Sequence, residues 1–115
     1  MIAQVSPFQF AAWRDQASAA PVVLDVREPW ELQTASVTPD GFTLLHVPMQ
    51  SIPARLAELQ NNYGADQPIA CLCHHGMRRQ QVAHYLAQHG FTDVVNLQGG
   101  IAAWAQQLDA RIPQY

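Results

Sequence analysis

Residues 68–79 read PIACLCHHGMRR, which passes from an apolar run through a polar loop into a helical pattern. The apolar part, Ile69–Leu72, predicts a buried strand, and Arg79–His89 predicts a helix that ends at Gly90. Cys73 stands between them, at the start of the loop. Backbone N–H groups converge at such a turn, and the dipole of the following helix directs its positive end there. This environment favours a thiolate and stabilises an anion held on it or beside it.

The rest of the chain continues the alternation of short apolar runs and helical patterns. Further strands are predicted at Val22–Val26, Thr43–Val47 and Val94–Leu97. Helices are predicted from Ser6 to about Ala17, from Trp30 to Ala35, from Pro53 to the stretch Asn61–Gly64, and from Gly99–Gly100 onward with Ile101, Trp104, Ala105 and Leu108 on one face. This order predicts an α/β fold with a mostly parallel sheet covered by helices on both faces. A chain of 115 residues has the length of a single domain, residues 1–115.

Polar segments follow the ends of the four predicted strands. They are Asp25–Glu28, His46–Met49, Cys73–Arg78 and Gln98–Gly100. In parallel sheets the ligand site lies beyond the carboxyl ends of the strands. We therefore expect these segments to meet at one edge of the sheet and to form the functional site there.

The composition excludes several classes of function. All six basic residues are arginines, so Schiff-base chemistry and a P-loop lysine are excluded. No basic stripe is present that could bind nucleic-acid phosphates, and no apolar run approaches the length of a membrane span. The first residues lack the basic and then apolar pattern of a signal peptide. We expect a cytoplasmic protein that binds neither nucleic acid nor membrane.

Two cysteines, Cys71 and Cys73, lie two residues apart. Cys71 falls inside the apolar strand and is interpreted as a packing residue, because free cysteine usually behaves as a small hydrophobe. Cys73 is followed by His74 and His75 rather than by more apolar chain, so we interpret it as a nucleophile. Structural zinc sites draw their ligands from two separated pairs, whereas the candidate metal ligands Cys71, Cys73, His74 and His75 are consecutive or nearly so. We expect no metal and no cofactor.

The loop after the cysteine supplies the candidate substrate-binding residues. Gly76 lets the backbone turn without a Cβ penalty. His74, His75 and Met77 then present N–H groups inward, although either histidine could equally be a solvated loop residue. Arg78 either directs its guanidinium at an incoming anion such as thiosulfate or pairs with an acid at the helix start.

Arg27 is a second cation at the predicted edge of the sheet. It follows the first core strand and lies close in sequence to Asp25. One interpretation is that Arg27 contributes to the anion pocket. The other is a structural Asp25–Arg27 pair that ties the loops together, because a buried carboxylate needs a partner. For Asp25 we favour the structural interpretation, and for Arg27 both remain open.

Four motifs in this order resemble the rhodanese family of sulfurtransferases, specifically the small single-domain bacterial type. Leu24–Glu31 is similar to the first signature of that family, and 46–56 is similar to the strand and helix after its middle loop. Cys73–Arg78 matches the six-residue active loop, Cys-x-x-Gly-x-Arg. Leu97–Trp104 resembles the closing Gly-Gly-x-x-x-Trp signature. The resemblance covers nearly the whole chain.

The resemblance implies a three-layer rhodanese-like fold with a central sheet of four to five strands. It also implies a ping-pong sulfur transfer in which the Cys73 thiolate attacks the outer sulfur of thiosulfate or of a persulfide donor. The resulting persulfide would be passed to cyanide or to a thiol acceptor, which could be a protein in a sulfur relay. No nearby general base is required, because the leaving group departs as a stable anion.

The chain departs from the family pattern at two points, and two other functions compete. Residues 35–42 lack the Gly-His-Ile motif that often precedes the second core strand, and Arg79 replaces a small residue. One competing function is a related cysteine phosphatase or arsenate reductase, whose Cys-x5-Arg loop would end at Arg79. The other is a non-catalytic rhodanese-like interaction module, which the presence of Cys73 does not favour.

Overall fold

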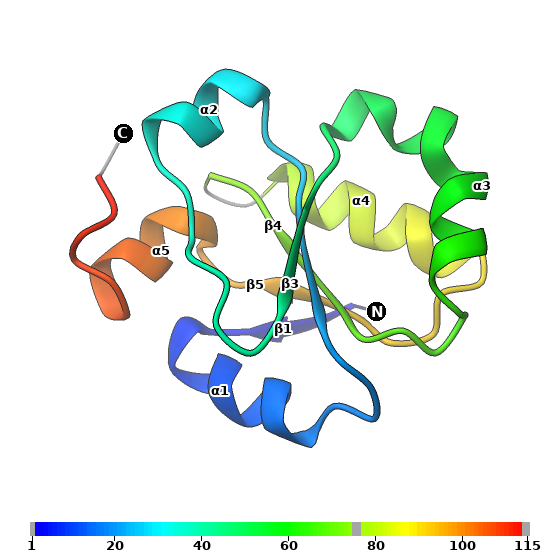
Figure 1. Cartoon of the computed structure of the whole chain (residues 1–115), viewed down its shortest axis with the longest axis horizontal. Coiled ribbons are helices and arrows are strands. Elements are labelled where there is room, and N and C mark those ends of the chain that lie inside the picture. The colour runs from blue at the N-terminus through cyan, green and yellow to red at the C-terminus, as the bar shows by residue number, and fades with distance from the viewer. Residues whose placement is uncertain (1, 75–76, 114–115) are drawn as a thin grey trace.

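The computed structural model describes residues 2–74 and 77–113 and shows an α/β fold (Figure 1). Its elements follow one another as β1 (Ala3–Val5), α1 (Pro7–Gln16), β2 (Val22–Asp25), α2 (Pro29–Thr34), β3 (Thr43–His46), the 3₁₀ turn η1 (Met49–Ser51), α3 (Ile52–Asn62), β4 (Ile69–Leu72), α4 (Met77–Gln88), β5 (Val94–Leu97) and α5 (Gly100–Gln107). The alternation of strands and helices predicted from the sequence is confirmed.

The five strands form one sheet in the order β1-β5-β4-β2-β3, and every pairing is parallel. The central strands β2, β4 and β5 are buried on both faces, which explains their continuous apolar runs. The register places Asp25 beside both His46 and Leu72. The carboxyl ends of β2, β3 and β4 are therefore level with one another.

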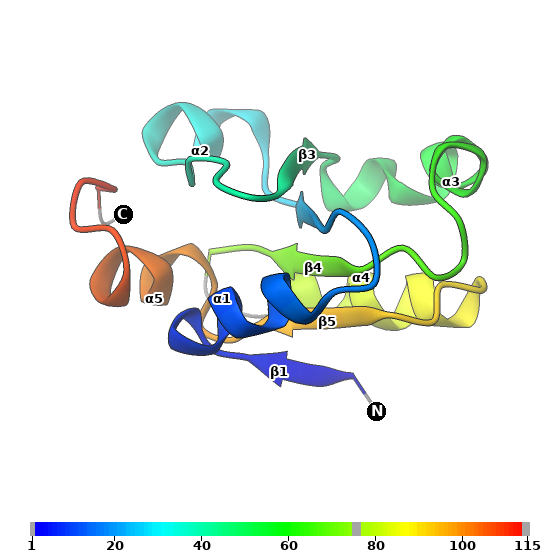
Figure 2. The same ribbon diagram turned by 60° about the horizontal axis from the view of Figure 1, so that its bottom comes forward.

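Helices cover both faces of the sheet and make three layers. Apolar residues of α1 and α5 pack on one face with Val23, Ala70 and Val95, and those of α3 and α4 pack on the other with Leu24 and Cys71. In both views β4 ends between α2 and α5 (Figures 1 and 2). The segment that begins at Cys73 is thereby placed at the carboxyl edge of the sheet.

Three details of the structure correct the sequence interpretation. The short edge strand β1 was not identified. Helix α4 begins at Met77 rather than at Arg79. Helix α5 ends at Gln107, and Leu108, which was placed on its inward face, is 45% exposed. The apolar repeat continues past the point at which the helix itself stops.

Candidate active site

Cys73 directly follows the buried strand β4, and helix α4 begins four residues later at Met77. The predicted order of a buried strand followed by a helix is confirmed, and residues 75 and 76 of the connection lie outside the described residues. The side chain of Cys73 is only 1% exposed and belongs to the same buried cluster as Cys71 and Val82.

The start of helix α5 fixes two consecutive carbonyl groups of the backbone, those of Cys73 and His74. The amide of Ile101 donates to the carbonyl oxygen of Cys73 at 2.8 Å, and that of Ala102 donates to the carbonyl oxygen of His74 at 3.3 Å. These contacts use N–H groups that have no partner within the helix itself. The segment that carries the thiol is thus hydrogen-bonded to α5 as well as continuous with β4.

This contact explains why two glycines precede Ile101. Gly99 and Gly100 have left-handed φ angles of 77° and 62°. A Cβ on Gly100 would lie 2.5 Å from the carbonyl oxygen of His74 and still closer to that of Cys73. Position 100 therefore requires glycine both for its conformation and for the close approach of the two backbones. From the sequence, Gly99 and Gly100 are expected at this edge of the sheet, but their contact with the backbone of Cys73 and His74 is not predicted.

Arg27 forms a buried ion pair with Asp25, and both side chains are completely covered. The Asp25 carboxylate accepts from Arg27 Nη2 at 2.7 Å and from Nε at 2.9 Å. Arg27 Nη1 lies 3.4 Å from the carbonyl oxygen of Glu31, which anchors the pair to helix α2. Of the two interpretations left open, the structure shows the structural pair. A direct contact between Arg27 and substrate stays a prediction.

His46 is a further residue at this edge, and the sequence gave it no role. Its Nε2 lies 2.7 Å from the carbonyl oxygen of Arg27, so Nε2 carries the proton that this oxygen accepts. The contact ties the end of β3 to the turn after β2. The sequence signal was the position of His46 near the end of the predicted strand Thr43–Val47, in the segment His46–Met49 that was expected at this edge.

The remaining predicted site residues are described only in part. His74 is half-buried beside Cys73. His75 and Gly76 lie outside the described residues, as do the side chains of Met77 and Arg78. Cys71 is completely buried, as its interpretation as a packing residue requires. Within residues 2–74 and 77–113 no cluster of histidine, cysteine and acidic side chains could hold a metal ion.

Comparison with known proteins identifies the family. The model of the rhodanese-like domain matches residues 8–107, and the chain belongs to this family. A sulfurtransferase of Allochromatium vinosum is 36% identical over 85 residues, which cover 74% of this chain and 72% of that protein. The thiosulfate sulfurtransferase GlpE of Pseudoalteromonas translucida is 35% identical over 83 residues, which cover 72% of this chain and 71% of GlpE. These relatives support a sulfurtransferase role.

Solved structures agree on the fold. A rhodanese-like domain protein from Staphylococcus aureus superposes with a TM-score of 0.74 over 99% of each chain, at 23% identity. This superposition confirms the parallel α/β architecture, and the family match over residues 8–107 confirms the resemblance carried by the four sequence motifs. No helix in the described part of the chain is both long enough and apolar enough to span a membrane.

Proposed function

We propose that the protein transfers sulfane sulfur through a persulfide on Cys73. The observation that carries this proposal is the position of the Cys73 thiol, between the end of a buried parallel strand and the start of the twelve-residue helix α4. The positive end of that helix favours an anionic sulfur. The anchoring of the Cys73 carbonyl by α5 supports the same role, because it fixes the backbone that carries the nucleophile.

Each half of the reaction is a displacement at sulfur. The Cys73 thiolate attacks the outer sulfur of thiosulfate, the sulfur–sulfur bond of the donor breaks, and sulfite leaves with the bonding electron pair. Cyanide or a thiolate acceptor then attacks the outer sulfur of the persulfide, and Cys73 departs as a thiolate. No proton has to be removed in either displacement, so the chemistry needs an anion-stabilising site more than a general base.

The burial of Cys73 supports a slender donor. Because Cys73 is only 1% exposed, a terminal sulfur atom on a small anion or on a persulfide suits the site better than a bulky electrophile. The name of the GlpE relative, a thiosulfate sulfurtransferase, supports thiosulfate as the first donor to try. The acceptor would be cyanide or a thiol, including the thiol of a partner protein.

Intact-mass measurement after incubation with thiosulfate tests the proposal. We expect the wild type to gain the mass of one sulfur atom, which cyanide then removes. Cys73→Ser should show no gain, whereas the matched control Cys71→Ala should gain sulfur like the wild type. A Cys73→Ser variant that still gains cyanide-labile sulfur would refute the assignment of the nucleophile. Turnover of an aryl phosphate that depends on Cys73 would favour the phosphatase alternative instead.

A further inference from the structure

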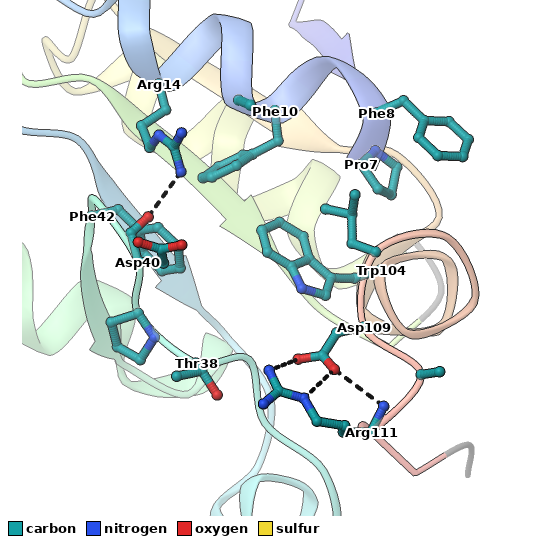
Figure 3. A pocket seen from close by; sticks show the side chains of 14 residues that line it. Pro7, Phe8, Phe10, Arg14, Thr38, Asp40, Phe42, Trp104, Asp109 and Arg111 are labelled. Atoms are coloured by element: carbon teal, nitrogen blue, oxygen red, sulfur yellow. Dashed lines mark hydrogen bonds and ion pairs between the residues drawn. The ribbon is translucent and has the colours of Figure 1, made fainter.

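A cavity with a volume of about 610 Å³, whose lining does not include Cys73, lies on the face of the sheet covered by α1 and α5 (Figure 3). Helix α1, residues 38–42 and the end of α5 form its walls. The segment before β3 is where the chain departs from the family pattern. Cavities of this size commonly hold small organic ligands.

The floor of this cavity, which we call the α1/α5 cavity, consists of aromatic rings that pack edge to face. Phe10 lies 5.4 Å from Phe42 and 4.9 Å from Trp104, measured between ring centroids. Two apolar side chains stand at its rim, Phe8 at 71% exposure and Leu108 at 45%. In the described part of the chain only one other large hydrophobic side chain, Trp30, is similarly exposed. Exposed apolar residues that gather around one cavity mark a binding surface.

Arg14 supplies a fixed cation at one end of the cavity (Figure 3). Its Nη1 donates to the carbonyl oxygen of Asp40 at 3.0 Å, and its Nε donates to Asp15 at 3.2 Å. Its side chain also lies against Gly41, where a Cβ would come within 3.0 Å of Arg14 Cδ. These contacts hold the guanidinium in place, and within the described residues Nη2 has no hydrogen-bond acceptor. A guanidinium group fixed in this way is prepared to bind a carboxylate or sulfonate.

The other charges of the α1/α5 cavity leave this donor available. At the opposite end Arg111 binds Asp109 through Nε at 2.8 Å and Nη2 at 3.0 Å, so the Asp109 carboxylate is already neutralised. This hydrogen-bonded pairing holds the pKa of Asp109 below its ordinary value. Asp15, which forms an ion pair with Arg14 through Nε, and Asp40 are both exposed to solvent, where water and salt screen their carboxylates.

We propose that the α1/α5 cavity binds a small amphipathic anion, whose apolar or aromatic body lies on Phe10, Phe42 and Trp104 and whose carboxylate or sulfonate accepts from Arg14 Nη2. The rings provide apolar contact area, and the arginine fixes the orientation of the ligand. This site is separate from the proposed sulfur transfer and does not depend on it.

Two fluorescent probes test the proposal. Anilinonaphthalene sulfonate has an aromatic body and one anionic group, and phenylnaphthylamine has a similar body without the charge. We expect the wild type to bind one sulfonate per chain more tightly than the neutral probe. Arg14→Gln should weaken sulfonate binding about tenfold, in line with the loss of a charged hydrogen bond, and leave the neutral probe nearly unaffected. The matched control Arg55→Gln removes an arginine from outside the cavity and should change neither affinity.

A second pair of variants tests the apolar part without altering the core. Phe8→Ser removes a rim side chain that is largely exposed and should weaken both probes several-fold. Trp30→Ser removes a comparably exposed aromatic residue elsewhere and should weaken neither. The proposal is overturned if Phe8→Ser binds both probes as the wild type does, or if Trp30→Ser weakens them equally. Equal weakening of both probes by Arg14→Gln would overturn the anionic part of the assignment.

Discussion

Replacing Gly100 by alanine tests whether helix α5 holds the segment that carries Cys73. The new Cβ would lie 2.5 Å from the carbonyl oxygen of His74, at a backbone φ of 62°. The left-handed conformation costs roughly 1–2 kcal/mol for a residue other than glycine. Relief of the overlap costs typically about 1–3 kcal/mol more. We expect the free energy of unfolding to fall by about 2–5 kcal/mol, a large share of the roughly 5–15 kcal/mol available to a small domain.

Alanine substitutions at two other glycines distinguish the conformational cost from the steric cost. Gly90 also has a left-handed φ, 101°, but an added Cβ would meet nothing within 4 Å. Gly90→Ala should therefore show the conformational cost alone, roughly 1–2 kcal/mol. Gly64 has neither a left-handed φ nor a neighbour within 4 Å. Gly64→Ala should be neutral or stabilise by about 0.4–1 kcal/mol, because alanine restricts the unfolded chain.

The two readouts are urea unfolding and the rate at which thiosulfate loads sulfur onto Cys73. In Gly100→Ala the helix must move back from the loop, so the bond from the Ile101 amide to the Cys73 carbonyl oxygen should lengthen or break. We expect slower sulfur loading under conditions in which the variant remains folded. A Gly100→Ala protein as stable as Gly90→Ala would refute the steric reasoning. A destabilised variant that loads sulfur at the wild-type rate would refute the link to the site.

Three further predictions concern buried or paired polar groups. Arg27→Met should destabilise the fold by about 3–5 kcal/mol in urea unfolding, because it leaves Asp25 buried without its ion-pair partner. The double variant Arg27→Met/Asp25→Leu should recover much of this loss. Asn96 is fully buried, and its carboxamide has no hydrogen-bond partner among the described residues. Asn96→Leu should therefore leave the stability of the fold unchanged or raise it by about 1–3 kcal/mol. A lower melting temperature in thermal melts would contradict this account. The pKa of Asp109 lies below its ordinary value because Arg111 hydrogen-bonds its carboxylate, so its stabilising contribution is present at neutral pH and is lost as the pH falls through that lowered pKa. An NMR titration of Arg111→Gln should show the pKa of Asp109 returning upward, and an unchanged value would refute the assigned cause.

The central part of the fold could be predicted because each buried parallel strand leaves a local trace. Val22–Val26 and Ile69–Leu72 are apolar without alternation, as strands covered on both faces must be. The inward face of α4 was likewise predicted, and Val82, Ala83 and Leu86 are buried. These patterns arise from burial and from the helical period, and both are visible within a short window of sequence.

The elements that were missed depend on contacts made elsewhere in the chain. Strand β1 has only three residues, and its definition comes from pairing with Val95–Leu97 on β5. Leu108 continues the apolar repeat of α5 but lies beyond its last residue, where it lines the cavity with Phe8. No local pattern distinguishes an apolar residue that enters the core from one that borders an exposed hollow.

The residues of the candidate site also differ in whether a local sequence pattern or a distant contact determines them. Cys73 could be proposed as the nucleophile because a strand, a turn and a helix that follow directly in sequence create its environment. The requirement for glycine at position 100 comes instead from the carbonyl oxygens of Cys73 and His74, on a segment one strand away. Those oxygens accept hydrogen bonds from the first turn of α5, so any side chain at position 100 would push the backbone of Cys73 away. The parallel pairing of β4 with β5 brings the two strand ends together. Only this pairing shows that Gly99–Gly100 and the segment Cys73–His74 contact each other and form one site.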